Sequence, residues 1–348
     1  MIYLDNASTT MPNKITMRYL SHYNSIFGNP SNIYKIGEAT HEMIEDAREK
    51  VAKAIGADTE DIYFTSGASE SNAWAIAQCD ACVCSPYEHH SIMANPKVKQ
   101  SIEFLTLLYS HMLVNNETGE IFEVGKRFQE IHRKKYLTHT DATQAIGNIF
   151  IDVKDLGADM LSLSGHKIHA PKGIGVLYIN HEAIPRERIK PLIYGSQENN
   201  RRGGTENVLG ILCLGGCIEE ANRDIIKKAK YCSILKEEVK YILSKSGVDY
   251  RINSPENSIA STINFSLKDV SSEVIASMLS DEEIYIGTGS ACNNSSLSPS
   301  YVLQAMNVPE DYIRGAIRLS FDLSTKDIDV IVATNKIIEC YKKLKGNN

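Results

Sequence analysis

The amino-acid sequence predicts an α/β protein: a large domain on a mostly parallel, mixed sheet flanked by helices, followed by a smaller α+β domain. Up to about residue 220, short apolar runs alternate with segments of helical periodicity, which is typical of a parallel sheet covered by helices. Beyond it, a long polar helix leads into a denser succession of short strands and helices. We therefore divide the chain inside that helix into domains 1–225 and 226–348, with residues 1–15 free to pack with the smaller domain.

The elements of the large domain follow in order. Residues 37–56 predict an amphipathic helix that ends at a glycine, and its apolar stripe consists of Ala39, Met43, Ala47, Val51 and Ala54. The strand "DIYFT", the turn "SGASES" and a helix from about Asn72 come next. Residues 106–114 predict a buried strand and 123–135 a charged helix, before the strands of "YLTHTDATQ", "ADMLSLSG" and "GIGVLYI".

Composition excludes several classes of protein. A chain of 348 residues with 43% hydrophobic residues can bury substantial cores, and its net charge of −6 carries no basic stripe, so we expect no direct nucleic-acid partner. No apolar run approaches the length of a membrane span, so we expect no membrane association. The start "MIYLDNASTT" has Asp5 where a signal peptide needs an apolar run, which predicts a cytoplasmic protein with its eight cysteines reduced.

A lysine follows a buried strand in "LSLSGHKIHAPKGIG", residues 161–175. The apolar alternation breaks at Ser164, and His166 and Lys167 come directly after a Ser-Gly turn. A structural lysine belongs on a solvated face, so a lysine at a strand end is placed for chemistry. Ser164 to Lys167 also fit the S-x-x-K pattern of penicillin-binding enzymes, but the S-D-N and K-T-G motifs of that family do not occur in this sequence.

Three turns and Arg318 offer groups that could bind an anion or exchange a proton. "TSGASES" places hydroxyls and backbone N–H groups at a helix start, which suits a phosphate but also an ordinary capped turn. Asp141 ends a strand in "HTDATQA", together with Gln144, and is either a catalytic carboxylate or a helix cap. The basic, glycine-rich "RRGGTEN" (201–207) could add phosphate contacts, and Arg318 could hold a carboxylate through a bidentate pair, although either could be a surface feature.

The cysteines and histidines allow two further readings. The spacing in "CDACVCSPYEHH" (79–90) could suit a metal, but alternation within a strand favours packing, and we predict no metal site. Cys292 stands in the Gly/Ser/Asn-rich segment "GTGSACNNSSLSPS", which suits an exposed, reactive thiol or an incidental surface cysteine.

The whole chain resembles the cysteine desulfurases of the NifS/IscS type, which are pyridoxal 5′-phosphate (PLP) enzymes of fold type I in the class-V aminotransferase family. The resemblance rests on a series of motifs in the right order: "YLDNASTT", "FGNPSNIYKIG", "FTSGASESN", "EHHS", "LVNNETG", "HTDATQAIG", "LSGHKIHAPKGIGVLY", "QENNRRGGTENV", "GTGSACNNSSLSPSYVL" and "IRLSF".

The resemblance implies a role for each candidate residue. At the ring of PLP, Lys167 forms the Schiff base and moves the substrate α-proton, His89 stacks on the pyridine ring and assists proton transfer, Asp141 pairs with the pyridinium nitrogen, and Gln144 hydrogen-bonds the phenolic oxygen. The phosphate is held by Ala68, Ser69, Ser164 and His166, and Thr205 reaches the phosphate of the neighbouring subunit of a homodimer. Asn116 contacts the cofactor and, with Arg318, holds the substrate carboxylate.

The implied reaction removes sulfur from L-cysteine. Cys292 attacks the substrate sulfur as a thiolate and becomes a persulfide, L-alanine leaves, and the sulfur passes to a protein acceptor such as an Fe–S scaffold or a tRNA- or cofactor-thiolation enzyme. A selenocysteine lyase or an aminotransferase would share Lys167 and Asp141 but would not need Cys292 for its central chemistry. A non-catalytic homologue that acts as a binding partner is the remaining alternative.

The sequence departs from the family pattern mainly by its brevity. Between "EHHS" and "TLLYSHMLVNNE" only "IMANPKVKQSIEFL" remains, and a second contraction precedes "CVCSPYEHH". In the family's sheet order the missing strand lies at an edge, so we predict a shortened large domain with an intact site. "NPSNIYKIG" also lacks the usual histidine, and Ser69 replaces the usual threonine but keeps its hydroxyl.

Overall fold

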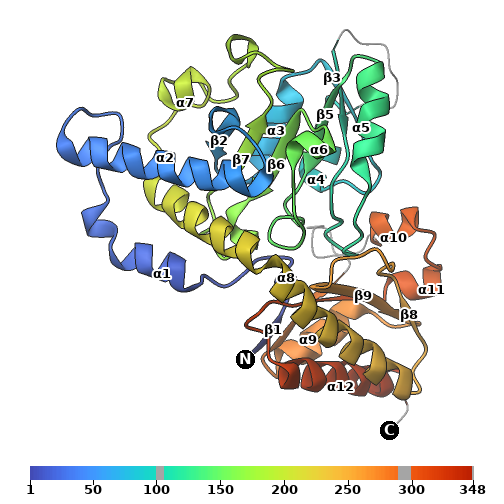
Figure 1. Cartoon of the computed structure of the whole chain (residues 1–348). Coiled ribbons are helices and arrows are strands. Elements are labelled where there is room, and N and C mark those ends of the chain that lie inside the picture. Colours follow the sequence, from blue (N-terminus) through green and yellow to red (C-terminus); the bar gives the residue numbers. More distant parts are fainter. Residues whose placement is uncertain (99–105, 289–298, 347–348) are drawn as a thin grey trace. The chain divides into compact units, whose positions relative to one another are not determined.

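The computed structural model describes residues 1–98, 106–288 and 299–346 of the chain (Figure 1). The chain forms two compact units. The small unit comprises Met1–Thr9, Val114–Ile121 and Ile226–Asn348, and the large unit comprises Thr10–Leu113 and Phe122–Ile225. No helix among the described residues is long and apolar enough to cross a membrane.

The large unit is built on a six-stranded mixed sheet of order β2-β7-β6-β5-β4-β3. Its strands are β2 (Ile62–Thr65), β3 (Ala81–Cys84), β4 (Leu107–Ser110), β5 (Leu137–Asp141), β6 (Met160–Ser164) and β7 (Gly175–Ile179). Strands β3 to β6 are parallel to one another, whereas β7 is antiparallel to both β6 and β2. The parallel strands bring their carboxyl ends to one edge of the sheet, where ligands of such sheets bind.

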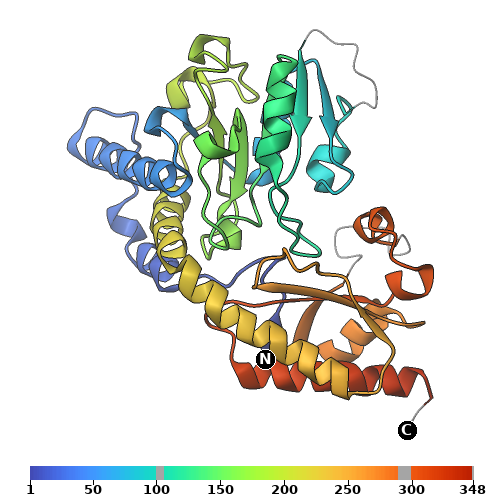
Figure 2. The same cartoon turned by 45° about the vertical axis from the view of Figure 1, so that its right-hand side comes forward.

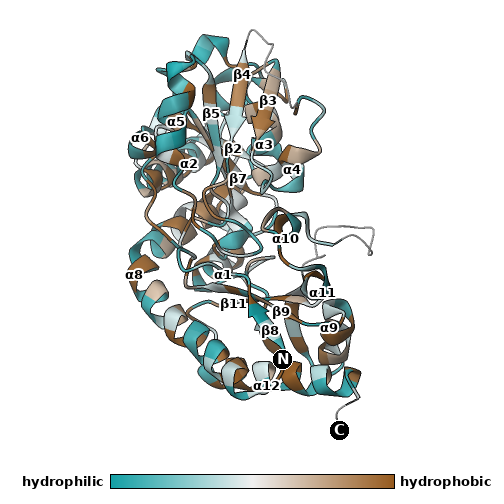
Figure 3. Ribbon diagram, turned by 90° about the vertical axis from the view of Figure 1, so that its right-hand side faces the viewer, coloured by the Kyte–Doolittle hydropathy of each residue, from teal (hydrophilic) through white to brown (hydrophobic). Residues whose placement is uncertain are grey.

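Helices surround this sheet. They are α1 (Lys14–Ser21), α2 (Lys35–Ile55), α3 (Ala68–Ala77), α4 (His90–Met93), α5 (Val124–Arg133), α6 (Val153–Leu156), α7 (Gln197–Asn200) and the first part of α8 (Val208–Lys245). Helix α5 buries only Val124, Phe128 and Ile131 and is mostly hydrophilic in Figure 3, as its charged sequence predicts. Short α7 contains left-handed backbone at Glu198, with φ of 46°.

The predicted helix at 37–56 is confirmed, and Ala47, Val51 and Ala54 of its predicted apolar stripe are buried, but its first turns bury other residues than predicted. Ala39 and Met43 are exposed, whereas Thr40 and Ile44 are buried. The cause is a close backbone approach at Gly37, where an added Cβ would lie 2.4 Å from the carbonyl oxygen of Asn32. That contact turns the Gly37 side of the helix inward.

The outer edge of the sheet beyond β3 is short among the described residues. There, only Val98 bridges to β3, through an isolated parallel pair with Cys82. The backbone N–H of Cys82 donates to the Lys97 carbonyl over 2.9 Å. Much of the shortened stretch after His90, residues 99–105, lies outside the described residues.

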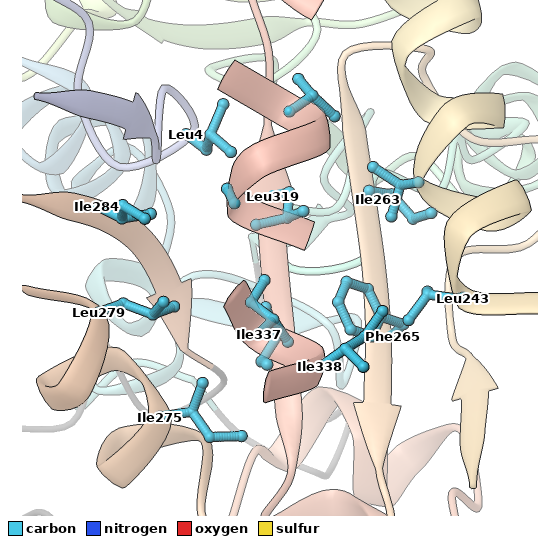
Figure 4. Close-up of a cluster of buried hydrophobic side chains, with 14 of the residues drawn as sticks. Leu4, Leu243, Ile263, Phe265, Ile275, Leu279, Ile284, Leu319, Ile337 and Ile338 are labelled. Carbon is cyan, nitrogen blue, oxygen red and sulfur yellow. The ribbon is translucent and has the colours of Figure 1, made fainter. Parts of the chain in front are cut away.

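The small unit has a five-stranded sheet of order β1-β10-β11-β9-β8. It contains β1 (Ile2–Leu4), β8 (Tyr250–Ile252), β9 (Thr262–Leu267), β10 (Ile284–Thr288) and β11 (Ala316–Ser320), with α9 (Ser272–Ser280), α10 (Tyr301–Ala305), α11 (Glu310–Ile313) and α12 (Asp327–Leu344). The second half of α8 and helix α12 run side by side in Figures 1 and 2. Both contribute to one apolar cluster with the strands, which Figure 4 shows from Leu4 to Ile338.

One segment differs from the division drawn from the sequence. Residues Val114–Ile121, which carry Asn116, belong to the small unit and not to the large one. The reason is backbone pairing: the N–H of Ile121 donates to the Asn257 carbonyl, and the N–H of Ile259 donates to the Gly119 carbonyl, both over 2.9 Å.

Candidate active site

Lys167 lies one turn beyond the carboxyl end of buried strand β6, in the 3₁₀ turn Gly165–Lys167. Thr10 holds this turn, since its N–H and its Oγ1 both donate to the His166 carbonyl over 2.9 Å. The N–H of His169 in turn donates to Thr10 Oγ1 over 2.7 Å. Burial, together with the positive charges of Lys167 and Lys172, lowers the pKa of His166 to about 4, so its imidazole is neutral at neutral pH.

The start of α3 is suited to an anion. Gly67 occupies the N-cap position and offers no side-chain cap, so the first-turn N–H groups around Ala68 and Ser69 are not satisfied by a cap. Ser164 belongs to the same region, because its Oγ lies 3.6 Å from the position a Cβ on Gly67 would take. Gly175 permits this packing, since a Cβ there would lie 2.5 Å from the Gly67 Cα. These residues therefore fit a phosphate.

The loop before α8 is tied to the same helix start. Arg202 donates to the Glu70 carboxylate through Nε over 3.0 Å and through Nη2 over 3.2 Å. Glu70 also accepts from the N–H of Ser66 over 2.7 Å. Burial has the largest single effect on the pKa of Glu70 and raises it, but the hydrogen bonds from Arg202 and Ser66 together outweigh burial and lower the pKa. Thr205 is exposed on this loop.

Asp141 ends β5 and is 5% exposed. Its Oδ1 accepts from the N–H of Thr143 over 2.9 Å, and its Oδ2 accepts from Asn72 Nδ2 over 2.8 Å. The same Asn72 nitrogen lies 2.9 Å from Ser91 Oγ, which lies 2.9 Å from His89 Nδ1. Burial lowers the pKa of His89, with Lys167 acting in the same direction and Asp141 against it. The structure thus connects two predicted residues, Asp141 and His89, through two that were not predicted.

A second row of hydrogen-bonded polar side chains crosses β4, β5 and β6. Its β5 member is His139, two residues before Asp141. Ser110 Oγ lies 3.1 Å from Glu88 Oε1 and 2.9 Å from His139 Nδ1, and His139 Nε2 lies 2.9 Å from Ser162 Oγ. All four side chains are 0% exposed. The sheet register explains the row, because Ser110 is paired with His139, and Ser162 with Asp141.

This row predicts a pH dependence of stability. Burial and repulsion from Asp141 raise the pKa of Glu88 to about 8, although Ser110 and the N–H groups of Met112 and His89 oppose the shift. An unfolded glutamate titrates near pH ~4.3, so as pH rises the unfolded state loses this proton before the folded state does. Glu88 therefore makes the free energy of unfolding fall as pH rises from about 4 to about 8. Burial lowers the pKa of His139 to about 4, so stability from His139 is lost as pH falls from about 6.5 to about 4.

Below pH ~6.5, Glu88 and His139 change the free energy of unfolding in opposite directions as the pH changes. The contribution of Glu88 is therefore tested above pH ~6.5. Between pH ~6.5 and ~8 we expect the free energy of unfolding to fall by up to roughly 1.4 kcal/mol per pH unit more in the wild type than in Glu88→Gln. Chemical denaturation at several pH values measures this difference. Parallel curves for the two proteins would show that Glu88 is already ionised in the folded state.

Arg318 and Asn116 lie together in the small unit. Arg318 Nη1 donates to the Asn116 carbonyl over 2.6 Å, while Nη2 donates to Asp5 Oδ1 and Ser8 Oγ, each over 2.7 Å. The Arg318 side chain is therefore held by the protein, and three of its roughly five N–H donors are engaged. Arg318 Nε and Asn116 Oδ1 are buried and have no hydrogen-bond partner among the described residues. These two atoms suit a carboxylate and an amine or hydroxyl of a ligand.

Glu117 anchors the segment beside Asn116. Its Oε2 accepts from Ser300 Oγ over 2.5 Å, and Ser300 caps the N-terminus of α10 through the N–H of Leu303. Burial raises the pKa of Glu117 to about 7, with Ser300 and Arg318 opposing. Cys292 lies outside the described residues, so its place is not part of this geometry.

The remaining predicted residues are placed as follows. Gln144 is 9% exposed, in the turn after Asp141. Cys79 and Cys82 are 0% exposed and belong to the apolar cluster of the large unit, with Cys84 packed against it. Within residues 1–98, 106–288 and 299–346 there is no group of three side chains that could hold a metal ion.

The residues that sequence reasoning missed are Asn72, Ser91, Glu88, Ser110 and His139. Asn72 was assigned only to a helix, and Ser110 and His139 only to strands, whereas Glu88 and Ser91 flank the two histidines of the motif "EHHS". For the strand residues, the usable signal was a polar side chain within a buried strand, since buried polar groups need specific partners.

Comparison with known proteins places this geometry in a family. The aminotransferase class-V family model matches residues 2–103 and 96–331. A cysteine desulfurase IscS of Methanosarcina thermophila is 37% identical over 380 positions, covering 99% of this chain and 93% of that protein. A cysteine desulfurase NifS of Azotobacter vinelandii is 31% identical, covering 94% and 90%. Since 380 aligned positions exceed the chain's 348 residues, this chain is shortened relative to the first of these.

Solved structures agree with the sequence relatives. A NifS-like protein superposes with a TM-score of 0.86 at 30% identity, covering 97% of this chain and 98% of its own. A structure named SspA in complex with cysteine superposes with a TM-score of 0.78 at 29% identity, covering 92% and 99%. The predicted α/β fold of type I is thereby confirmed. The chain belongs to the class-V aminotransferase family and, within it, to the cysteine desulfurases of the NifS/IscS type.

Proposed function

We propose that this protein takes sulfur from L-cysteine with the help of PLP, releases L-alanine and holds the sulfur as a persulfide on Cys292. The observation that best supports the cofactor is the placement of Lys167 and Asp141. Asp141 ends β5, and Lys167 follows the end of neighbouring parallel strand β6, so both lie at one edge of one sheet. A lysine amine and a carboxylate at that edge, beside an uncapped helix start, fit PLP.

The residues of the large unit would divide the work on the cofactor. Bound PLP supplies an electron sink for charge that develops on the substrate. Lys167 would hold it covalently and move a proton at Nζ, and Asp141 would accept the hydrogen bond of the ring nitrogen. Gln144 would bind the phenolic oxygen, and His89 would stack on the ring. The phosphate would lie at the start of α3, with Ala68, Ser69, Ser164 and His166.

Residues of the small unit would bind the substrate and accept its sulfur. Arg318 and Asn116 would hold the carboxylate of L-cysteine through N–H donors, and Arg318 Nε, a donor, has no partner among the described residues. The Cys292 thiolate would attack the substrate sulfur: the C–S bond of cysteine breaks, an S–S bond to Cys292 forms, and the carbon takes a proton to become the methyl group of alanine. The persulfide would then pass to a protein acceptor, such as an Fe–S scaffold or a thiolation enzyme.

Two further parts of the proposal concern assembly and location. The exposed Thr205 would reach the phosphate of a second copy, which makes the active unit a homodimer. The buried thiols of Cys79 and Cys82, which form no disulfide among the described residues, support a reducing, cytoplasmic environment.

Release of alanine tests the function directly. PLP-loaded protein given L-cysteine and a thiol reductant should form alanine over many turnovers, because the reductant removes sulfur from Cys292 as sulfide. Cys292→Ser should reduce this release to background while cofactor binding is kept. Alanine formation that does not change in Cys292→Ser would favour a selenocysteine lyase. Loss of the amino group of cysteine without alanine would favour an aminotransferase, because that reaction leaves the C–S bond intact. Neither reaction from a protein that binds PLP would favour a non-catalytic homologue.

A further inference from the structure

Asn72 has an unusual position for a buried amide. It lies on α3 and is 0% exposed, yet its Oδ1 is buried and accepts no hydrogen bond from the described residues. An unsatisfied buried polar atom costs stability, so Asn72 is not explained by packing or by its own hydrogen-bond satisfaction. Its nitrogen, in contrast, makes two hydrogen bonds, to Asp141 and to Ser91.

Each hydrogen bond that links Asp141, Asn72, Ser91 and His89 has a definite donor and acceptor. The amide nitrogen of Asn72 is a donor only, so one N–H goes to Asp141 Oδ2 and the other to Ser91 Oγ. A flipped amide would set its oxygen against the Asp141 carboxylate. The backbone N–H of Ser91 donates to His89 Nδ1 over 3.2 Å, which makes this ring nitrogen an acceptor. Ser91 Oγ lies 2.9 Å from Nδ1 and therefore gives it the hydroxyl hydrogen while accepting from Asn72.

His89 is consequently restricted to one tautomer. Because Nδ1 accepts hydrogen bonds, the neutral ring carries its proton on Nε2. Protonation at Nδ1 would require Ser91 to rotate and the ring to leave the N–H of Ser91. Only Nε2 is therefore available to exchange a proton with a bound ligand. The charges that act on His89 are those of Asp141, Lys167 and, when protonated, His90.

We propose that Asn72 is a positioning residue that holds the Asp141 carboxylate and, through Ser91, fixes His89 with its proton on Nε2. The proposal rests on the proposed function, in which Asp141 and His89 contact PLP. It has two arms that can be separated: the hydrogen bond from Asn72 to Asp141, and the link from Asn72 through Ser91 to His89. Asn72→Leu, which has nearly the same shape, removes both arms, whereas Ser91→Ala cuts only the arm to His89. Ser71→Ala is the matched control, since Ser71 is a buried polar residue of the same helix that bonds Thr65 Oγ1 and the Val176 carbonyl.

The first experiment measures the His89 tautomer in cofactor-free protein. With ¹⁵N-labelled histidine, NMR of the ring nitrogens should show a protonated Nε2 and an accepting Nδ1 in the wild type and in Ser71→Ala. Ser91→Ala and Asn72→Leu keep the backbone N–H of Ser91 but disturb the hydroxyl donor, so both should raise the share of the tautomer protonated on Nδ1. A wild-type ring protonated on Nδ1, or a tautomer that neither variant changes, would overturn the proposal. This measurement needs neither PLP nor turnover.

The second experiment measures PLP affinity. Loss of a hydrogen bond that holds a charged carboxylate should weaken PLP binding by about 10-fold or more in Asn72→Leu. Ser91→Ala and Ser71→Ala should bind within about twofold of the wild type, since both leave the bond to Asp141. Equal weakening in Ser91→Ala and Asn72→Leu would contradict the separation of the arms. A wild type that binds no PLP would instead refute the proposed function, while the tautomer measurement still decides the role of Asn72.

Discussion

Replacing Lys167 by alanine is expected to lower the rate of alanine release by about 10⁴-fold or more, because the change removes both a covalent attachment and a proton-transfer group. The variant should still fold. Lys167 is partly exposed and lies beyond the end of β6, in a turn that Thr10 holds through the backbone carbonyl of His166. The rate is measured with saturating L-cysteine and PLP.

Lys172 provides a matched control for this prediction. It is the second lysine of the same glycine-rich turn and is exposed. Lys172→Ala should keep the rate within a few-fold of the wild type, and its melting temperature should match that of Lys167→Ala. If Lys167→Ala keeps more than about 1% of the wild-type rate, the lysine cannot carry the proton transfer proposed for it.

Some parts of the site could be predicted because they depend on neighbours along the chain. Lys167 follows a strand and a Ser-Gly turn, and Asp141 ends a strand, so each is recognisable from its own segment. The start of α3, which we propose to bind the phosphate, belongs to the same class, since a strand, a small-residue turn and a helix adjoin in sequence. Local sequence is sufficient where one turn of backbone positions the group.

Other parts could not be predicted because they depend on sheet register and on segments far apart in the sequence. Ser110 meets His139 only because β4 and β5 pair in that register. Asn72 meets Ser91 only once α3 packs against α4. Periodicity alone also misplaced the buried face at the start of α2, because the backbone contact at Gly37 comes from the separate Asn29–Asn32 turn. Pairings of this kind are fixed by tertiary packing, which a single sequence does not display.

Arg318 shows how burial changes the meaning of a predicted residue. From the sequence it was either a carboxylate-binding residue or a surface residue; the structure makes it 5% exposed and paired with Asp5. Its neighbours on β11, Ile317 and Leu319, point into the apolar core of the small unit, so Arg318 projects from the opposite face of the sheet. Gly287 leaves room there, since a Cβ would lie 2.7 Å from Asp5 Oδ1.

Replacing Arg318 by alanine is accordingly expected to have two large effects. The free energy of unfolding should fall by about 3–5 kcal/mol, because Asp5 loses its partner in a largely buried ion pair. The KM for L-cysteine should rise by about 10–100-fold, since a hydrogen-bonded pair with the substrate carboxylate is lost. Denaturation and steady-state kinetics measure the two effects on the same preparation.

Asp5→Asn separates the structural effect from the substrate effect. It removes the charge of the partner but leaves the guanidinium, Ser8 and the Asn116 carbonyl in place. This variant should lose stability but keep the KM for L-cysteine within about threefold, because the atoms proposed to meet the substrate are unchanged. If the KM rises equally in both variants, Arg318 acts only by supporting Asp5 and the fold. If it rises in Arg318→Ala alone, a guanidinium that the protein holds in place also binds the substrate.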